Sequence, residues 1–251
     1  FINIKNSSTP VIKKEKKVTL TQEKDIITVN GEKYSRNSRA VSNNKEQNFI
    51  VDDFIKLKNK DLKTGKILKY NYNIPKNYDR SKSYPLVTFI HDAGTVGTES
   101  DITLIQGIGG VIWADPEEQA KHESFVLAPQ YPFAIVNDNF EITDEGDITI
   151  NLINSLIDQY SIDKNRLYIT GQSMGCMTSI ALNIKYPDMF AASFLVAGQW
   201  NPDAMTVLAH NKMWIVVSEG DQKAFPGMNA SLEKMKAAGA VISTEFWDGQ
   251  A

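Results

Sequence analysis

Short apolar runs alternate with longer amphipathic stretches along most of the chain. Runs rich in apolar residues are typical of parallel strands buried on both faces, and they occur at 86–90, 125–128, 166–170, 194–196 and 213–217. Two further strands are expected at 67–74 and 241–247. This alternation of strands with helix-length stretches predicts an α/β fold, in which a mostly parallel central sheet is flanked by helices.

The stretches between the strands carry the spacing and the end signals of helices. Within 147–160, apolar side chains recur every four residues and therefore share one face of a helix. The stretch 174–186 ends directly before Pro187, and 229–238 ends before Gly239. Both endings are typical of helix C-termini, so three helices are expected here.

The first 48 residues differ in composition from the rest, because they are rich in Lys, Asn and Ser. They contain two short apolar runs, at 18–20 and 26–29, and the second is followed by the turn-forming pair Asn30-Gly31. We therefore expect an N-terminal β extension or linker over 1–48 and the main α/β domain over 49–251.

Composition narrows the classes of partner. The formal net charge of −3 gives no reason to expect binding to nucleic acid or to an anionic membrane, and no apolar run approaches the roughly 18 residues that suggest a membrane span. The lone Cys176 cannot form an internal disulfide, and no zinc motif is present, so no cofactor is expected. The chain begins at Phe1 rather than Met, which favours a processed, secreted protein.

The strongest chemical signal is the run Gly171-Gln172-Ser173-Met174-Gly175. A serine hydroxyl becomes a good nucleophile when a base takes its proton and its oxygen stands clear of its neighbours. Glycines two residues either side allow a tight turn between a strand and a helix, and the context here is strand, then serine, then helix. We therefore predict that Ser173 is a catalytic nucleophile.

Such chemistry needs N–H donors for the oxyanion that forms on the attacked carbonyl. The N–H of Met174 is one candidate. A second is the N–H of Ala93, because the strand 86–90 runs directly into His91-Asp92-Ala93-Gly94. His91 precedes the serine, against the order serine, acid, histidine of this motif, so it is expected to organise the loop.

The acid that would orient a catalytic histidine is expected just beyond the strand 213–217. Asp221 fits this position best, in the run Ser218-Glu219-Gly220-Asp221. Asp203, which follows the strand 194–196, is the alternative acid. Glu219 is expected to be a structural residue next to the acid and not the acid itself.

Several ordered runs resemble the predicted-peptidase and esterase branch of the α/β hydrolases, which is related to polyhydroxybutyrate depolymerases and to feruloyl and acetylxylan esterases. The matching runs are 72–78, 91–97, 128–132, 171–175, and 219–221 with 225–228. The resemblance implies ester hydrolysis through an acyl-enzyme, with Ser173 as nucleophile and Asp221 as acid. Some members carry an N-terminal β-sandwich, for which residues 1–48 are too few.

The chain departs from that family at two points. Asp92 stands where the family usually has glycine, which puts a carboxylate beside the proposed oxyanion donors. No histidine follows Asp221, since the three are His91, His122 and His210, and the last two are expected at the surface. We therefore expect that this chain lacks its natural C-terminal part and, as it stands, hydrolyses esters poorly.

Three functions stay open at this stage. The first is a serine carboxylesterase acting on acyl or aromatic esters, small or polymeric. The second is a serine peptidase of the same fold, and the third is a non-catalytic secreted binding protein. Trp200 and Phe225 lie near the expected site and are candidate substrate-binding residues, favouring a bulky or aromatic acyl group. The sequence indicates no oligomeric state.

Overall fold

The computed structural model describes residues 20–23, 26–29, 32–35, 50–241 and 243–247, with side chains over 50–241. None of the helices in these ranges is long and apolar enough to cross a membrane.

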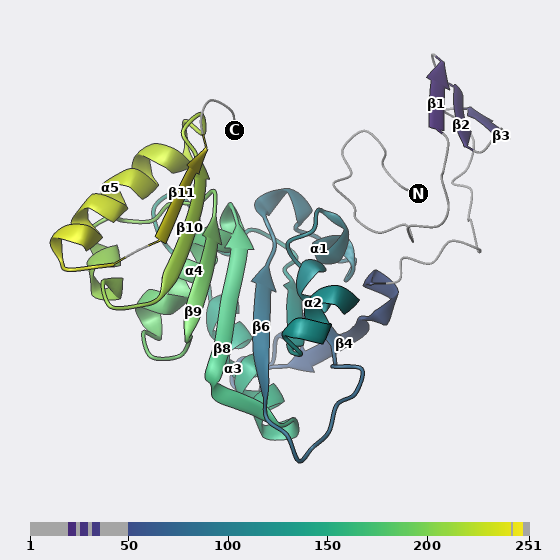
Figure 1. The fold of residues 1–251 in the computed structure, drawn as a ribbon, viewed down its shortest axis with the longest axis horizontal. Helices are drawn as coiled ribbons and strands as arrows, with labels where there is room; N and C mark the ends of the chain where they lie inside the picture. Colours follow the sequence, from purple (N-terminus) through teal and green to yellow (C-terminus); the bar gives the residue numbers. More distant parts are fainter. Residues whose placement is uncertain (1–19, 24–25, 30–31, 36–49, 242, 248–251) are drawn as a thin grey trace.

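The main body is built on an eight-stranded sheet whose strands run in the order β11-β10-β9-β8-β6-β7-β5-β4 (Figure 1). The strands are β4 (Ile55–Lys60), β5 (Ile67–Asn73), β6 (Tyr84–Ile90), β7 (Phe125–Gln130), β8 (Ile162–Gln172), β9 (Ala192–Val196), β10 (Met213–Ser218) and β11 (Ser243–Trp247). β4 and β5 pair antiparallel at one edge, and the other six strands, from β7 across to β11, run parallel. The expected mostly parallel α/β sheet is therefore confirmed.

The strand order reverses at β6. From β6 the chain first crosses to β7 on one side and later returns to β8 on the other. In open α/β sheets, loops at the carboxyl ends of the strands around such a reversal form the ligand site. The topology thus brings the loop after β6 and the turn after β8 to the same edge of the sheet.

Three longer helices share a hydrophobic core with one face of the sheet: α3 (Glu145–Gln159), α4 (Met174–Lys185) and α5 (Ala224–Ala237). Their apolar side chains, such as Leu152, Ile180 and Leu232, are buried with Leu86 and Ile169 of the strands. The other face carries a smaller core. The short helix α1 (Ile102–Ile105) contributes Leu104 to it, and the short helix α2 (Pro116–Lys121) begins two residues after Ala114, another member of this core. Single 3-10 turns complete the elements: η1 (Val51–Asp53), η2 (Ala93–Thr95), η3 (Ile112–Ala114) and η4 (Ala204–Leu208).

Each strand expected from the apolar runs of the main domain is present, but several features differ from prediction. β8 begins at Ile162 and not at residue 166, and the short helix at Ile102–Ile105 was not expected. The strand β4 was not expected. The helix α5 begins at Ala224 and not at residue 229, because the Asp221 carboxylate accepts the N–H groups of Lys223 and Ala224 and so caps an earlier first turn.

The N-terminal region contains a separate three-stranded antiparallel sheet of β1 (Leu20–Glu23), β2 (Ile26–Val29) and β3 (Glu32–Ser35). The expected strand at 26–29 is present. The Asn30-Gly31 pair falls between β2 and β3, but those two residues, like 18–19, lie outside the described ones.

Candidate active site

Ser173 occupies the junction between the last residue of β8 and the first residue of α4. Its backbone is held at φ 51° and ψ −117°, outside the regions that non-glycine residues favour. Its N–H donates to the carbonyl of Val196 (2.9 Å), and its own carbonyl accepts from the N–H of Met177 (3.0 Å). The residue is exposed, and no described group hydrogen-bonds its hydroxyl. The strained turn therefore presents a free hydroxyl to solvent, as an activated serine requires.

The glycines of the run allow α4 to lie against the end of β6. A Cβ on Gly175 would stand 2.0 Å from the carbonyl oxygen of Ile90, and one on Gly171 would stand 2.5 Å from the carbonyl carbon of Gly175. A third glycine, Gly198, was not singled out from the sequence. A Cβ there would meet the Cβ of Cys176 at 2.5 Å and the carbonyl oxygen of Ser173 at 3.1 Å.

The two expected oxyanion donors lie on these closely packed elements. Ala93 begins the exposed turn η2 after β6, and Met174 begins α4. Within 50–241, neither backbone N–H donates to another protein group. Gly94 cannot serve in the same way, because its N–H donates to Asp92 Oδ1 (2.7 Å). The arrangement offers two unengaged N–H groups on the elements that flank Ser173.

His91 is fully buried, and both of its ring nitrogens are engaged. Nε2 accepts the backbone N–H of Tyr131 (3.0 Å), so Nδ1 carries the proton and donates to the carbonyl of Asp92 (2.7 Å). Burial is the main influence and lowers the pKa of the imidazole, which keeps it neutral. His91 thus ties the loop after β6 to the residue after β7, which is the organising contact expected of it.

Asp221 lies half-buried in the turn after β10. Its Oδ1 accepts the N–H groups of Lys223 (3.0 Å) and Ala224 (2.8 Å), while Oδ2 has no hydrogen bond to a described residue. One carboxylate oxygen thus stays available for a further partner. The alternative acid Asp203 is exposed and ion-paired with Lys234, and Glu219 is exposed without a described role.

The remaining histidines do not join Ser173 and Asp221. His122 directly follows α2 and His210 follows η4; both are exposed, as expected. None of the three histidines hydrogen-bonds Ser173 or Asp221. Among the described residues, no group of three or more His, Cys, Asp or Glu side chains could hold a metal ion.

The two candidate substrate-binding residues differ in their surroundings. Trp200 is only 5% exposed, and its ring packs edge-on against Phe140 (centroids 5.5 Å apart), so it is part of the core. Phe225 is half-buried and its N–H donates to the carbonyl of Asp221 (3.0 Å). Of these two, only Phe225 therefore has surface that a substrate could contact. Phe140, held at φ 63°, was not singled out from the sequence.

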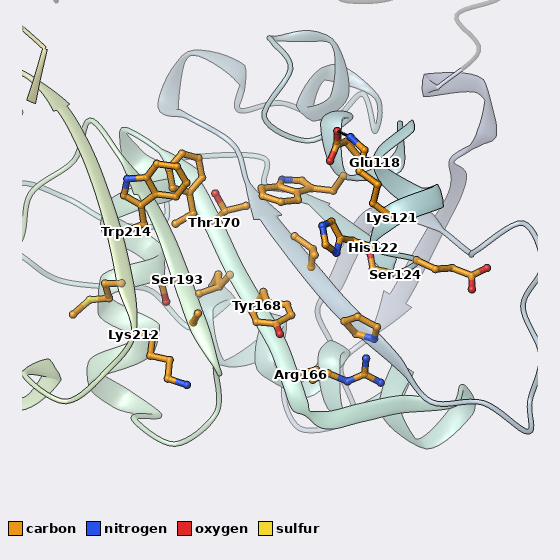
Figure 2. Close-up of a pocket in the computed structure, with 18 residues that line it drawn as sticks. Glu118, Lys121, His122, Ser124, Arg166, Tyr168, Thr170, Ser193, Lys212 and Trp214 are labelled. Carbon is orange, nitrogen blue, oxygen red and sulfur yellow. Dashed lines mark hydrogen bonds and ion pairs between the residues drawn. The ribbon is translucent and has the colours of Figure 1, made fainter. Parts of the chain in front are cut away.

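A groove of about 740 Å³ lies over strands β6, β8, β9 and β10, beside α2. Figure 2 shows the side chains that line it. It is lined by aromatic side chains, among them Tyr168, Phe194 and the half-exposed Trp214, with polar residues of α2 at one margin. No candidate catalytic, oxyanion or substrate-binding residue lines it. The groove is therefore not the site around Ser173.

Comparisons with known proteins find similarity to esterases. The profile of a putative esterase family matches residues 133–241. An endo-1,4-beta-xylanase/feruloyl esterase from Xylanibacter ruminicola is 29% identical over 195 residues, which are 70% of this chain and 26% of that protein. Acetylxylan esterase A from Emericella nidulans is 32% identical over 81 residues, 29% of this chain and 27% of that enzyme. The chain thus spans about a quarter of the length of each of these relatives.

Comparison with a solved structure identifies the fold. The crystal structure of a thermostable esterase superimposes with a TM-score of 0.76 at 29% identity, covering 80% of this chain and 56% of that one. The α/β-hydrolase fold expected from the sequence is confirmed.

Proposed function

We propose that this chain, which has the α/β-hydrolase fold and is similar to esterases, is a serine esterase that hydrolyses carboxylic esters through an acyl-enzyme formed on Ser173. The observation that carries the proposal is the exposed serine held at φ 51° between β8 and α4. Strain of this kind persists where the surrounding structure imposes it, and it is concentrated at functional sites.

The proposed reaction uses the groups around that turn. A base takes the proton of Ser173 Oγ as the oxygen bonds to the ester carbon, and the N–H groups of Met174 and Ala93 donate to the resulting oxyanion. The carbonyl re-forms as the C–O bond to the alcohol breaks, and the alcohol leaves with the proton. Water then releases the acid by the same steps. Asp221, through its open Oδ2, would orient and stabilise a histidine acting as the base.

We infer the substrate class from the relatives together with the surface at Phe225. The two relatives are named for feruloyl and acetylxylan ester hydrolysis. Phe225, next to the turn of Asp221, offers a partly exposed ring for an aromatic acyl group. We therefore propose acetyl and feruloyl esters of plant polysaccharide as substrates.

The remaining assignments follow from that substrate class. Polymeric substrates of this kind lie outside the cell, so we propose that the protein is secreted. We also propose that residues 1–48 form an extension of the hydrolase domain at 49–251, since the described strands β1 to β3 pair only with one another.

The test is made on the natural full-length protein and compares its wild-type form with Ser173→Ala on 4-nitrophenyl acetate and methyl ferulate. Loss of the nucleophile is expected to reduce kcat by about 10⁴-fold or more. Ser83→Ala is the control, because Ser83 is exposed and its side chain has no described hydrogen bond. Activity that survives in Ser173→Ala would refute the proposal. Faster cleavage of an amide than of the matching ester would favour a peptidase.

The acid is tested by Asp221→Asn beside Asp203→Asn. The Asn side chain can still accept the N–H groups that cap α5, so the fold is expected to persist while kcat falls by up to about 10⁴-fold. Asp203→Asn should stay within a few-fold of wild type, and the opposite ranking would transfer the role to Asp203.

A further inference from the structure

Asp92 is hydrogen-bonded to both sides of the proposed oxyanion site. Its Oδ1 accepts the N–H of Gly94 (2.7 Å) in its own loop. Its Oδ2 accepts Gln172 Nε2 (2.9 Å), from the last residue of β8, and Gln106 Nε2 (3.3 Å), from the end of α1. The Asp92–Gln172 bond is thus a direct side-chain link between the loop after β6 and the turn that holds Ser173.

The positions of the two linked residues give the bond its meaning. Asp92 directly precedes Ala93, and Gln172 directly precedes Ser173, whose neighbour is Met174. The two oxyanion donors lie on separate elements, and their separation must match a single oxygen atom to within a fraction of an ångström. We propose that Asp92, acting through Gln172, is a positioning residue that sets this separation. The inference rests on the proposed function.

The backbone of Asp92 is fixed independently from the other side. Its carbonyl accepts the Nδ1–H of His91, whose Nε2 is in turn held by the N–H of Tyr131 after β7. The backbone is thus anchored to the core and the side chain to the serine turn. A residue held at both ends can transmit the spacing between these elements.

A carboxylate near a developing oxyanion would oppose it unless its charge were offset. Three N–H groups point at the oxygens of Asp92, which is the compensation that a partly buried carboxylate requires. Gln106 is orientated for this role, because its Oε1 accepts the hydroxyl of Thr95 and its Nε2 therefore faces Asp92. By engaging Gly94, Asp92 also leaves Ala93 as the donor of this loop.

The test first removes the hydrogen-bond donor of the Asp92–Gln172 bond and then exchanges donor and acceptor, in the natural full-length protein. Gln172→Glu places two carboxylates in contact, so the loop and the turn should separate. We expect kcat to fall about 10- to 100-fold with KM nearly unchanged, which is part of the 10²- to 10³-fold effect of losing one oxyanion donor. In the double variant Asp92→Asn with Gln172→Glu, the amide of residue 92 can donate to the new carboxylate, and at least about tenfold of the loss should return.

Two controls separate the outcomes. Gln159→Glu makes the same change of charge on the exposed face of α3 and should leave kcat unaltered. Ser173→Ala shows whether the activity depends on the serine at all. If it does not, the proposed function fails; if it does and Gln172→Glu keeps wild-type kcat, or the double variant shows no recovery, the role of Asp92 alone is refuted. Should Gln172→Glu not fold, unaltered kcat in a folded Asp92→Ala would refute it equally.

Discussion

Replacing Gly175 by alanine tests how closely α4 approaches the end of β6. The new Cβ would lie 2.0 Å from the carbonyl oxygen of Ile90, 2.7 Å from its carbonyl carbon and 3.0 Å from the carbonyl oxygen of His91. All three are backbone atoms, so no side-chain rotation can relieve the contact. Because real Cβ atoms almost never approach closer than 3.0 Å, the helix and strand must separate by at least 1.0 Å (3.0 minus 2.0).

Helix propensity and steric contact predict opposite signs for this substitution. Alanine in place of glycine within a helix would stabilise the protein by up to about 1 kcal/mol if space were available. Overpacking costs typically about 1–3 kcal/mol, and contact with backbone atoms places this site at the upper end, so after the gain in propensity we expect a net loss of about 2 kcal/mol in the free energy of unfolding. A displacement of about 1 Å between the oxyanion donors should also lower kcat about 10²-fold.

Urea unfolding followed by circular dichroism, together with kcat on 4-nitrophenyl acetate, measures both effects. Gly227→Ala is the matched control within helix α5. There the nearest atom is the side-chain Oε1 of Gln199 (2.2 Å), which can rotate away, and the Cβ of Gln199 (2.9 Å) has to move by only 0.1 Å to reach 3.0 Å (3.0 minus 2.9). That variant should lie within about 1 kcal/mol of wild type. A Gly175→Ala protein as stable and as active as wild type would refute the close-contact reasoning.

Three further predictions concern buried groups. Burial lowers the pKa of His91 below its unfolded value of about 6.5, so the unfolded chain binds the proton first and the protein loses stability as the pH falls below that value. His91→Gln should flatten this part of the curve of stability against pH. An unchanged slope in urea unfolding between pH 7 and 5 would contradict the assignment. Phe125→Ala should cost about 3–5 kcal/mol of unfolding free energy, because the ring is fully buried and stacks on Tyr72 at 5.5 Å, whereas Phe133→Ala at an exposed ring should cost under about 1 kcal/mol. Burial raises the pKa of Cys176 to about 12, so a thiol reagent at pH 8 should modify it only after unfolding, and rapid reaction of the native protein would show that the site opens.

The central strands could be predicted from the sequence because they appear as apolar runs. β6 and β7 are almost completely buried, and β8, β9 and β10 still read as apolar runs although some of their residues are partly or fully exposed, such as the half-exposed Trp214. β4 could not be recognised in this way, because it is an edge strand with mostly exposed side chains and its residues Ile55–Lys60 alternate weakly. The early start of α5 was missed for a local reason: Pro226 and Gly227 suggest a turn, but a proline is tolerated in the first turn of a helix that Asp221 already caps.

In the candidate site, residues fixed by their neighbours in the sequence could be predicted, and residues fixed by contacts from distant loops could not. The serine turn is specified by five consecutive residues, so its glycines are recognisable from the sequence alone. Gly198 likewise has no room for a Cβ beside the serine turn. It lies in a loop 25 residues after Ser173 (198 minus 173), where no sequence spacing identifies it. Trp200 was expected to contact the substrate because it is an aromatic residue near the predicted site. Its contact with Phe140, from a different loop, buries it.

Asp92 shows why a departure from a family pattern cannot be interpreted from the chain alone. In the sequence it is an acidic residue in place of glycine, beside donors that must stabilise negative charge. Of the three groups that offset its charge, two are distant along the chain: Gln106, at the end of α1, and Gln172, 80 residues away. Because the pairing of β6 with β8 brings Gln172 beside Asp92, the same carboxylate links the two elements that carry the proposed oxyanion donors. Whether an unusual residue damages a site or supports it depends on partners that the fold supplies.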